Sequence, residues 1–323
     1  MDALPVLQIE DLQIDFTASK QTIPVLRGLS YTLPAGRVLA VVGESGSGKT
    51  VHALSLLGLL PPVAKVSRGR ILYKGTDLLT LTPSRLREIR GSKISMIFQD
   101  PAASLNPVLT VGEQLTETLR AHRKISKQEA REEAIHLLEK VGISDAARRL
   151  KAYPFEFSGG MCQRVMIAMA LALSPDILIA DEPTTALDVT IQAQILRLIK
   201  ELQQKQGMSV IFITHNLALA GEIADEVLVL YGGLCMEQAP AHELFTHPMH
   251  PYTKGLLASL VSIKDKPQRL PAIAGQPPVA GECGQGCPFA PRCPQAMKQC
   301  LTDLPPLVKR GTRQVRCFLE QEV

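Results

Sequence analysis

The chain has 323 residues, of which 46% are hydrophobic and 20% are charged, and its formal net charge is +4. This balance is typical of a globular protein with room for one large domain plus an appendage, or for two domains. Its lysines and arginines are scattered rather than gathered in runs, which gives no case for nucleic-acid binding. No basic segment followed by an apolar core opens the chain, and no run reaches the roughly 18 apolar residues of a membrane span. We therefore expect neither a signal peptide nor a transmembrane helix, and any membrane role has to come through a partner.

The first predicted elements are two strands. Residues 7–16 alternate loosely between apolar and polar side chains, and residues 29–33 read as the antiparallel partner. Phe16 ends the first of these strands. It is a candidate platform for a nucleobase, or a strand-end residue of the core, and the sequence leaves both readings open.

Residues 43–50 match the phosphate-binding pattern G-x-x-x-x-G-K-[ST] at every required position: Gly43, Glu44, Ser45, Gly46, Ser47, Gly48, Lys49 and Thr50. An apolar segment at 38–42 precedes them and predicts a buried strand, and the apolar residues 51–60 predict a helix. The loop thus joins a strand to a helix N-terminus, where free N–H groups and the helix dipole attract anions. We expect Lys49 to reach the β- and γ-phosphates of a nucleotide and the Thr50 hydroxyl to hold Mg²⁺.

The middle of the chain predicts a helical insertion within an α/β domain. Short strands are expected at 70–73 and 94–98, and residues 108–157 are mostly helical, with a capping box from Ser126 to Glu129. Alternation then returns, with a helix at 161–173, a strand at 177–180, a helix ending at Gly207, and strands at 210–213 and 227–231. Helix and strand in turn predict a parallel sheet with helices on its faces. Only one phosphate loop is present, so the chain is one nucleotide-binding unit.

Three further segments are candidates for the same site. Asp181 and Glu182 close an apolar strand, where Asp181 is expected to hold the metal and Glu182 to polarise an attacking water; the alternative is two solvated acids at a strand end. His215 follows the strand at 210–213, either to contact the γ-phosphate or as an ordinary surface or core histidine. Ser158, Gly159 and Gly160 open a helix and predict a second anion-binding end, which on one chain is best explained by an ATP held mainly by another subunit; a plain cap is the alternative.

Cysteines gather near the C-terminus. Of seven, Cys162 and Cys235 lie in the body, and five follow: Cys283, Cys287, Cys293, Cys300 and Cys317. The density favours a metal or redox site over disulfides. The pair Cys283 and Cys287 keeps zinc open, and four thiolates also suit an iron–sulfur cluster.

Taken together, the motifs resemble the ATP-binding-cassette (ABC) ATPases over residues 1–240. Residues 43–50 resemble the Walker A loop, 177–182 the Walker B strand with its catalytic glutamate, and 158–163 the signature, including Gln163. Gln99 resembles the Q-loop glutamine, a Mg²⁺ ligand in the family; residues 186–188 resemble the D-loop with Asp188, and His215 the switch histidine. Asn216 departs from the aspartate that many members carry. The resemblance implies an α/β ABC-type P-loop ATPase with an antiparallel β subdomain, a helical subdomain at about 108–157 and a small Cys-rich C-terminal extension. It also implies a sandwich of two cassettes with ATP between the Walker loop of one and the signature of the other.

Residues 241–323 resemble the C-terminal extension of the oligopeptide/dipeptide importer ATPases, through His250-Pro251-Tyr252-Thr253 and residues 286–294. In that subfamily the spacing of Cys287, Cys293, Cys300 and Cys317 is associated with a [4Fe–4S] cluster; Cys283 stays unassigned. The implied partners are a second, different cassette subunit, two transmembrane permease subunits and an extracytoplasmic binding protein. The implied place is the cytoplasmic face of the bacterial inner membrane.

The sequence therefore predicts an ATP-hydrolysing subunit of a bacterial di/oligopeptide importer, active with ATP and Mg²⁺. Metal chelates or antimicrobial peptides are alternative substrates. From other classes, a soluble cassette ATPase acting on DNA or ribosomes, and a non-enzymatic metal-binding regulator, stay open. The soluble ATPases generally hold two cassettes or long coiled-coil or basic insertions, and this chain has neither.

Overall fold

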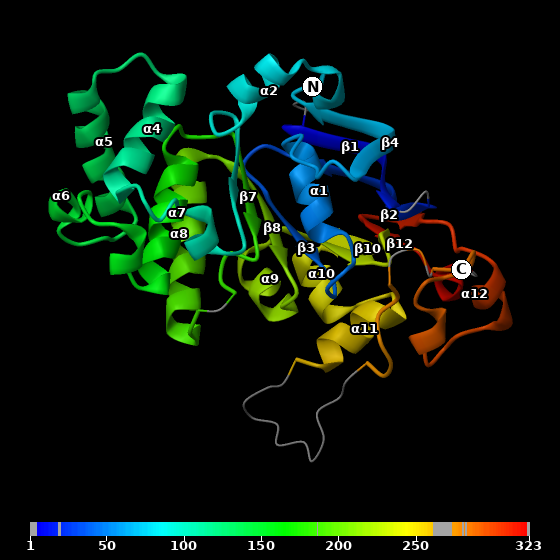
Figure 1. Ribbon diagram of the computed structural model, residues 1–323. Coiled ribbons are helices and arrows are strands. Elements are labelled where there is room, and N and C mark those ends of the chain that lie inside the picture. Colours follow the sequence, from blue (N-terminus) through cyan, green and yellow to red (C-terminus); the bar gives the residue numbers. More distant parts are fainter. Residues whose placement is uncertain are drawn as a thin grey trace. The chain divides into compact units, whose positions relative to one another are not determined.

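The computed structural model describes residues 5–18, 21–185, 187–260, 273–279, 281 and 283–321. Two compact units divide the chain. The first comprises Met1–Leu33, Arg37–Thr80 and Phe212–Val323, and the second comprises Pro34–Gly36 and Leu81–Ile211. Each unit is built from strands and helices (Figure 1). Within the described part of the chain, no helix combines the length and apolar character that crossing a membrane takes.

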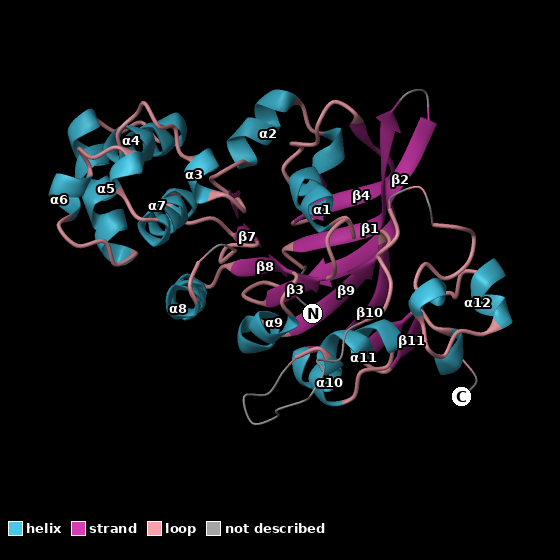
Figure 2. Ribbon diagram, turned by 60° about the horizontal axis from the view of Figure 1, so that its bottom comes forward, coloured by secondary structure: helices cyan, strands magenta, loops and turns pink. Residues whose placement is uncertain are grey.

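An antiparallel sheet opens the first unit, in the order β2-β1-β4-β5. Its strands are β1 (Leu7–Ala18), β2 (Gln21–Leu33), β4 (Ala64–Tyr73) and β5 (Thr76–Asp77), and β1, β2 and β4 lie side by side in Figure 2. The register Leu7↔Leu33 confirms the predicted antiparallel start. Both β2 and β4 begin earlier than the hydrophobic pattern indicated, because backbone pairing with β1, as at Thr17↔Thr22 and Asp15↔Lys65, holds residues whose side chains are not apolar.

The phosphate-binding segment lies between β3 (Val38–Val42) and helix α1 (Lys49–Leu56). All five residues of β3 are buried, as the apolar run predicts. The helix ends four residues before the predicted position. Gly58 adopts φ +59° and the Leu59 N–H donates to the Leu54 carbonyl, a closing pattern that ends a helix.

Parallel and antiparallel strands continue around β3 in the first unit. Strand β9 (Glu226–Tyr231) pairs with β3 in parallel, and β10 (Leu234–Pro240) pairs with β9 in antiparallel fashion. The hairpin β11 (Val308–Arg310) and β12 (Arg313–Val315) then pairs with β10. The remaining elements of this unit are η1 (Leu78–Thr80), α9 (Leu217–Ile223), α10 (Ala241–Thr246), α11 (Pro251–Ala258), η3 (Ala290–Arg292), α12 (Lys298–Thr302) and η4 (Phe318–Glu320).

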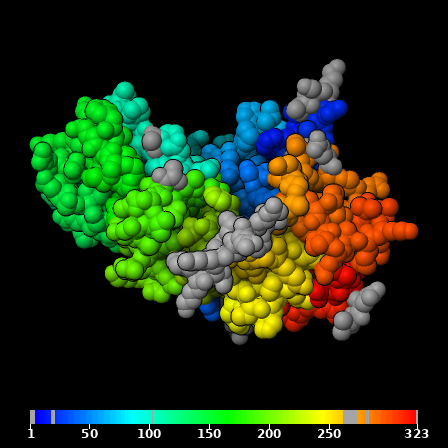
Figure 3. Space-filling model, turned by 90° about the horizontal axis from the view of Figure 1, so that it is seen from below, coloured from blue at the N-terminus to red at the C-terminus, as the bar shows by residue number. Residues whose placement is uncertain are grey.

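The C-terminal residues share the core of the first unit. Tyr252 and Phe289 are buried in one cluster with Ala40, Val229 and Tyr231. In the space-filling view the yellow atoms of α10 and α11 lie against orange and red atoms of later residues (Figure 3). The extension therefore packs on the strands that carry the phosphate loop.

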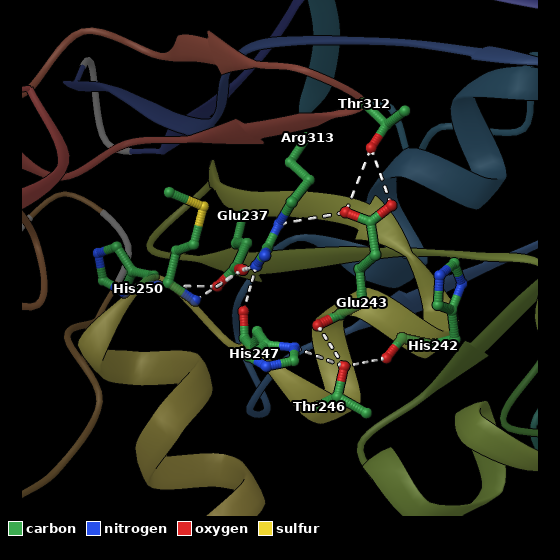
Figure 4. A network of polar contacts seen from close by, with 9 residues as sticks. Glu237, His242, Glu243, Thr246, His247, His250, Thr312 and Arg313 are labelled. Carbon is green, nitrogen blue, oxygen red and sulfur yellow. Dashed lines mark hydrogen bonds and ion pairs between the residues drawn. The ribbon is translucent and has the colours of Figure 1, made fainter. Parts of the chain in front are cut away.

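A buried carboxylate fastens this packing (Figure 4). Glu237 of β10 is fully buried and accepts hydrogen bonds from the Met249 and His250 N–H groups, each at 2.9 Å. Arg313 of β12 donates to the same carboxylate at 2.8 Å and to the His247 carbonyl. Next to it, the Thr312 hydroxyl donates to Glu243 of α10 at 3.0 Å. One acidic group thus ties the end of β10, the start of α11 and the terminal hairpin together.

The second unit is mainly helical around two parallel strands. Strand β6 (Ile94–Ile97) pairs with β7 (Ile177–Asp181) in parallel, as predicted. Its helices are α2 (Pro83–Ile89), α3 (Pro101–Ser104), α4 (Val111–His122), α5 (Lys127–Lys140), α6 (Ala146–Arg149), η2 (Pro154–Glu156), α7 (Gly159–Leu171) and α8 (Val189–Gln206). Helices α4, α5, α6 and α7 bunch together (Figure 1). The predicted capping box at Ser126 is present, and Gly207 closes α8 in a left-handed conformation. Strand β8 (Ser209–Thr214) spans the division between the units.

Candidate nucleotide and cysteine sites

The loop at residues 43–48 has a shape that only glycine permits at its two ends. A Cβ atom on Gly43 would lie 2.2 Å from the Leu230 carbonyl oxygen. Gly48 has φ +98°, and a Cβ there would meet the Leu26 side chain at 2.8 Å. The chain therefore passes close to β9 and β2 and turns sharply into α1, leaving backbone N–H groups at the helix N-terminus.

Side chains of this segment fit an anion. The ammonium group of Lys49, a residue only 5% exposed, donates to the Gly43 and Glu44 carbonyls at 2.7 and 2.9 Å, so it is held within the curve of the loop. The Ser47 hydroxyl is buried and has no hydrogen-bond partner among the described residues. Thr50 is exposed at the first turn of α1. A positive charge and an unused buried hydroxyl at a helix N-terminus are what a phosphate requires.

The second unit brings Gln99 and Glu182 together. The Gln99 side-chain amide, just after β6, donates to the Glu182 carboxylate at 3.2 Å, and the Thr185 hydroxyl donates to the same oxygen at 2.9 Å. Glu182 has φ +46°, a conformation that costs energy for a residue with a side chain and is common at functional sites. Asp181 ends β7 and is 1% exposed. Two carboxylates at a strand end, one strained and oriented by two donors, suit a metal and a water nucleophile.

The signature and D-loop residues also lie in the second unit. Ser158 caps α7 by accepting from the Met161 N–H at 3.4 Å, so the helix begins at Gly159, two residues before the predicted start at Met161. A Cβ on Gly160 would lie 3.1 Å from Ile191. Gln163 is 1% exposed and faces the interior. Asp188 caps α8 through a 3.0 Å bond from the Ile191 N–H, and Ala186 lies outside the described residues.

His215 and Phe16 lie in the first unit. His215 is exposed directly after β8, and its neighbour Asn216 caps α9 by accepting from the Ala218 N–H at 3.0 Å. The asparagine that departs from the family pattern thus has a structural role of its own. Phe16 is half-buried in β1, opposite Ile23. Its role as a nucleobase platform stays a prediction.

Comparison with known proteins agrees with this geometry. The ABC transporter family model matches residues 26–185, and the model of the oligopeptide/dipeptide transporter C-terminal region matches residues 236–300. The chain is 50% identical to the dipeptide transport ATP-binding protein DppD of Bacillus subtilis, over 98% of this chain and 95% of that protein. It is 48% identical to the oligopeptide transport ATP-binding protein AppD of the same species, over 98% and 97%. The chain belongs to this family of ABC transporter ATPase subunits.

A solved structure gives the fold. The ATP-binding cassette MJ0796, in a dimeric post-hydrolysis state bound to ADP and Pi, superposes with a TM-score of 0.66 at 27% identity, covering 73% of this chain and 98% of that chain. The predicted fold class, an ABC cassette with an antiparallel β subdomain and a helical region, is thereby confirmed.

The cysteines of this ATPase subunit converge in part. Cys287, Cys293, Cys300 and Cys317 line one small cavity of about 20 Å³, and the Cys287 N–H donates to the Cys300 carbonyl at 2.8 Å. Burial raises the pKa of Cys287 to about 11 and also raises the pKa of Cys293 and Cys317. Metal ligation requires thiolates, and burial makes ionisation of these three thiols harder when no metal is bound. Among the described residues, no group of three or more His, Cys, Asp or Glu side chains is arranged to hold a metal ion.

Sequence reasoning missed two residues of the ATPase that touch the phosphate loop. Arg292 forms an ion pair with Glu44 at 2.6 Å, and the Tyr252 hydroxyl accepts from the Glu44 N–H at 3.1 Å. Both belong to the segments that resemble the importer extension, but nothing in a linear pattern connects them to residue 44. The one available signal was an arginine placed directly before a cysteine of the cluster.

Proposed function

We propose that this ABC ATPase energises the import of di- or oligopeptides across a bacterial inner membrane. The observation that carries the proposal is the match of residues 236–300 to the oligopeptide/dipeptide transporter C-terminal region, in a chain that aligns with peptide transport ATPases over nearly its full length. Metal chelates and antimicrobial peptides are the competing substrates, and a transport assay separates them.

We also propose roles in ATP hydrolysis for residues of both units. Residues 43–50 would hold the phosphates of ATP, with Lys49 as the cation and Thr50, Gln99 and Asp181 as the groups that hold Mg²⁺. Bound Mg²⁺ would neutralise phosphate charge. Glu182 would orient and deprotonate the attacking water, and what supports this role is its positive φ and its two oriented donors.

For assembly, the proposal is a pair of cassettes in which Ser158, Gly159, Gly160 and Gln163 complete the partner's ATP site and Asp188 and His215 assist. ABC ATPase subunits dimerise and pair with permeases in peptide importers, and a dimeric cassette is among the similar structures. We infer a heterodimer with a second cassette, bound to two permease subunits at the cytoplasmic membrane face and served by an extracytoplasmic binding protein.

For the cysteine cavity, the proposal is a [4Fe–4S] cluster held by Cys287, Cys293, Cys300 and Cys317, with zinc as the alternative. What supports it is that all four thiols line one cavity. What opposes it is that the described residues contain no group of three or more His, Cys, Asp or Glu side chains arranged to hold a metal ion. Anaerobic purification followed by iron, sulfide and zinc assays tests it. A content below 0.1 iron and 0.1 zinc per chain, on the order of a trace, would refute both metals.

The function itself is tested in proteoliposomes that contain the chain with its cognate partner cassette, permeases and binding protein. We expect ATP-dependent uptake of labelled peptide, and we expect Glu182→Gln to lower ATP turnover by at least about 100-fold. Glu201→Gln, at an exposed position on α8, is the matched control and should behave as wild type. Uptake of a metal chelate in place of peptide would reject the substrate assignment, and full turnover in Glu182→Gln would reject the catalytic one.

A further inference from the structure

The second residue of the phosphate loop, Glu44, is held by the C-terminal extension. Arg292 donates to both of its carboxylate oxygens, from Nη1 to Oε2 at 2.6 Å and from Nη2 to Oε1 at 3.2 Å. The side chains are 7% and 24% exposed, so the pair is largely withdrawn from water. A bidentate pair of this kind fixes orientation as well as distance.

Arg292 is itself held in place. Its Nη1 also donates to the Tyr231 hydroxyl at 3.1 Å, and its guanidinium lies over the Tyr231 ring, 5.8 Å from the centroid. Its Nε donates to the Ala274 carbonyl at 2.9 Å, and Nη2 to the Ile273 carbonyl at 3.3 Å. Every nitrogen of the guanidinium therefore has an acceptor, and the group cannot swing away without breaking several bonds.

The backbone of Glu44 has a second anchor in the extension. Its N–H donates to the hydroxyl of Tyr252, a fully buried residue of α11. The Tyr252 ring packs on Tyr231 and Phe289, with centroids 4.6 and 5.2 Å apart. Phe289 and Arg292 belong to the same tight turn, closed by backbone bonds from Ala290 to Cys287 and from Cys293 to Ala290. The cysteine-bearing turn thus presents both an apolar anchor and the arginine.

Glu44 connects these contacts to the cation of the loop, because its carbonyl accepts a hydrogen bond from Lys49 at 2.9 Å. We propose that Arg292 is a positioning residue for ATP binding, which holds Glu44 and through it the curve of the phosphate loop and Lys49. The inference rests on the proposed function of residues 43–50 as the phosphate site. It makes the C-terminal extension part of the nucleotide-binding apparatus, in addition to whatever its cysteines bind.

The test compares variants of the full-length chain by equilibrium titration with a fluorescent ATP analogue, and by steady-state ATP turnover in the assembled transporter. We expect Arg292→Gln to weaken nucleotide binding by about three- to tenfold and to raise KM for ATP by a similar factor, with kcat little changed. Arg292→Lys keeps the charge but loses the fork and should fall in between. In a double-mutant cycle with Glu44→Gln, the two effects should not add, because each variant breaks the same pair.

Arg313→Gln is the matched control. Like Arg292, Arg313 belongs to the extension, is largely buried (12% side-chain exposure) and pairs with a carboxylate, but Arg313 contacts no residue of the phosphate loop. Arg313→Gln should lower stability and leave nucleotide affinity unchanged at temperatures where the variant is folded. The inference is overturned if Arg292→Gln binds ATP like wild type while Lys49→Ala does not bind. It is also overturned if Arg292→Gln loses affinity only to the extent that Arg313→Gln does. Unchanged binding in Lys49→Ala would instead overturn the proposed phosphate site, and the inference with it.

Discussion

Removing Arg313 should be one of the most costly single changes in the first unit, because it leaves a buried charge without its partner. Glu237 is fully buried, and among the described residues Arg313 is the cation that forms an ion pair with it. Breaking a buried pair by removing one partner typically costs about 3–5 kcal/mol. Two backbone N–H groups, from Met249 and His250, still donate to the carboxylate, so we expect a value near the lower end.

The measurement is urea unfolding followed by far-UV circular dichroism, since the chain has no tryptophan to report by fluorescence. We expect Arg313→Ala to lower the free energy of unfolding by about 3 kcal/mol. Arg37→Ala is the control, because its pair with Asp225 is exposed, at 62% and 39%, and such surface pairs contribute about 0–1 kcal/mol.

A double variant tests the cause. Combining Arg313→Met with Glu237→Gln removes both charges but keeps an oxygen that accepts from the backbone N–H groups, so part of the lost stability should return. If Arg313→Ala costs no more than Arg37→Ala, or if the double variant is less stable than the single one, the buried charge is not what fastens the extension.

Further predictions concern pH, capping and the loop. Burial lowers the pKa of His250 to about 3 and of His52 to about 4, so as pH falls the unfolded chain takes up these protons before the folded chain does. The free energy of unfolding should therefore decrease as pH drops from about 6.5 towards 4. Unfolding measured at several pH values should show a shallower decrease in His250→Asn. Asp188→Ala should destabilise α8 by about 1 kcal/mol, whereas Asp188→Asn keeps the helix cap. A loss of ATP turnover in Asp188→Asn, with stability unchanged, would therefore indicate a nucleotide role separate from capping. Gly43→Ala should abolish ATP binding because its Cβ would collide with Leu230, whereas Gly284→Ala, which meets nothing within 4 Å, should bind normally; equal affinity in titrations would contradict this.

Local patterns predicted the elements that local physics decides. The fully buried strands β3 and β7, the capping box at Ser126 and the left-handed stop at Gly207 all follow from residue types within a few positions. The phosphate-loop pattern is local in the same way, because its glycines, lysine and threonine all lie within residues 43–50. The predicted end of α1 was wrong because an apolar run does not reveal that Gly58 adopts a left-handed backbone conformation.

Pairing between distant segments was not predictable in the same way. Strands β11 and β12 are three residues each and partly polar, so they carry no periodic signal and exist because β10 offers an edge. Likewise, no sequence pattern around Glu237 identifies Arg313 as its partner. Four of the five thiols of the extension share a cavity, as their density in the sequence suggested, but a spacing pattern does not report the burial that raises the pKa of Cys287.

The contact between Glu44 and Arg292 shows what this limit means for function. The two residues are 248 positions apart, and each looks ordinary alone: one is a variable position within a phosphate-loop pattern, the other an arginine beside a cysteine. Folding places the guanidinium on the carboxylate because the turn that carries it also inserts Phe289 between His250, Tyr231 and Tyr252. Any change that shifts this turn should therefore also move the group that holds Glu44. Under the proposed role of Arg292, nucleotide affinity should depend on how this turn is packed, and the double-mutant cycle measures the coupling between Arg292 and Glu44.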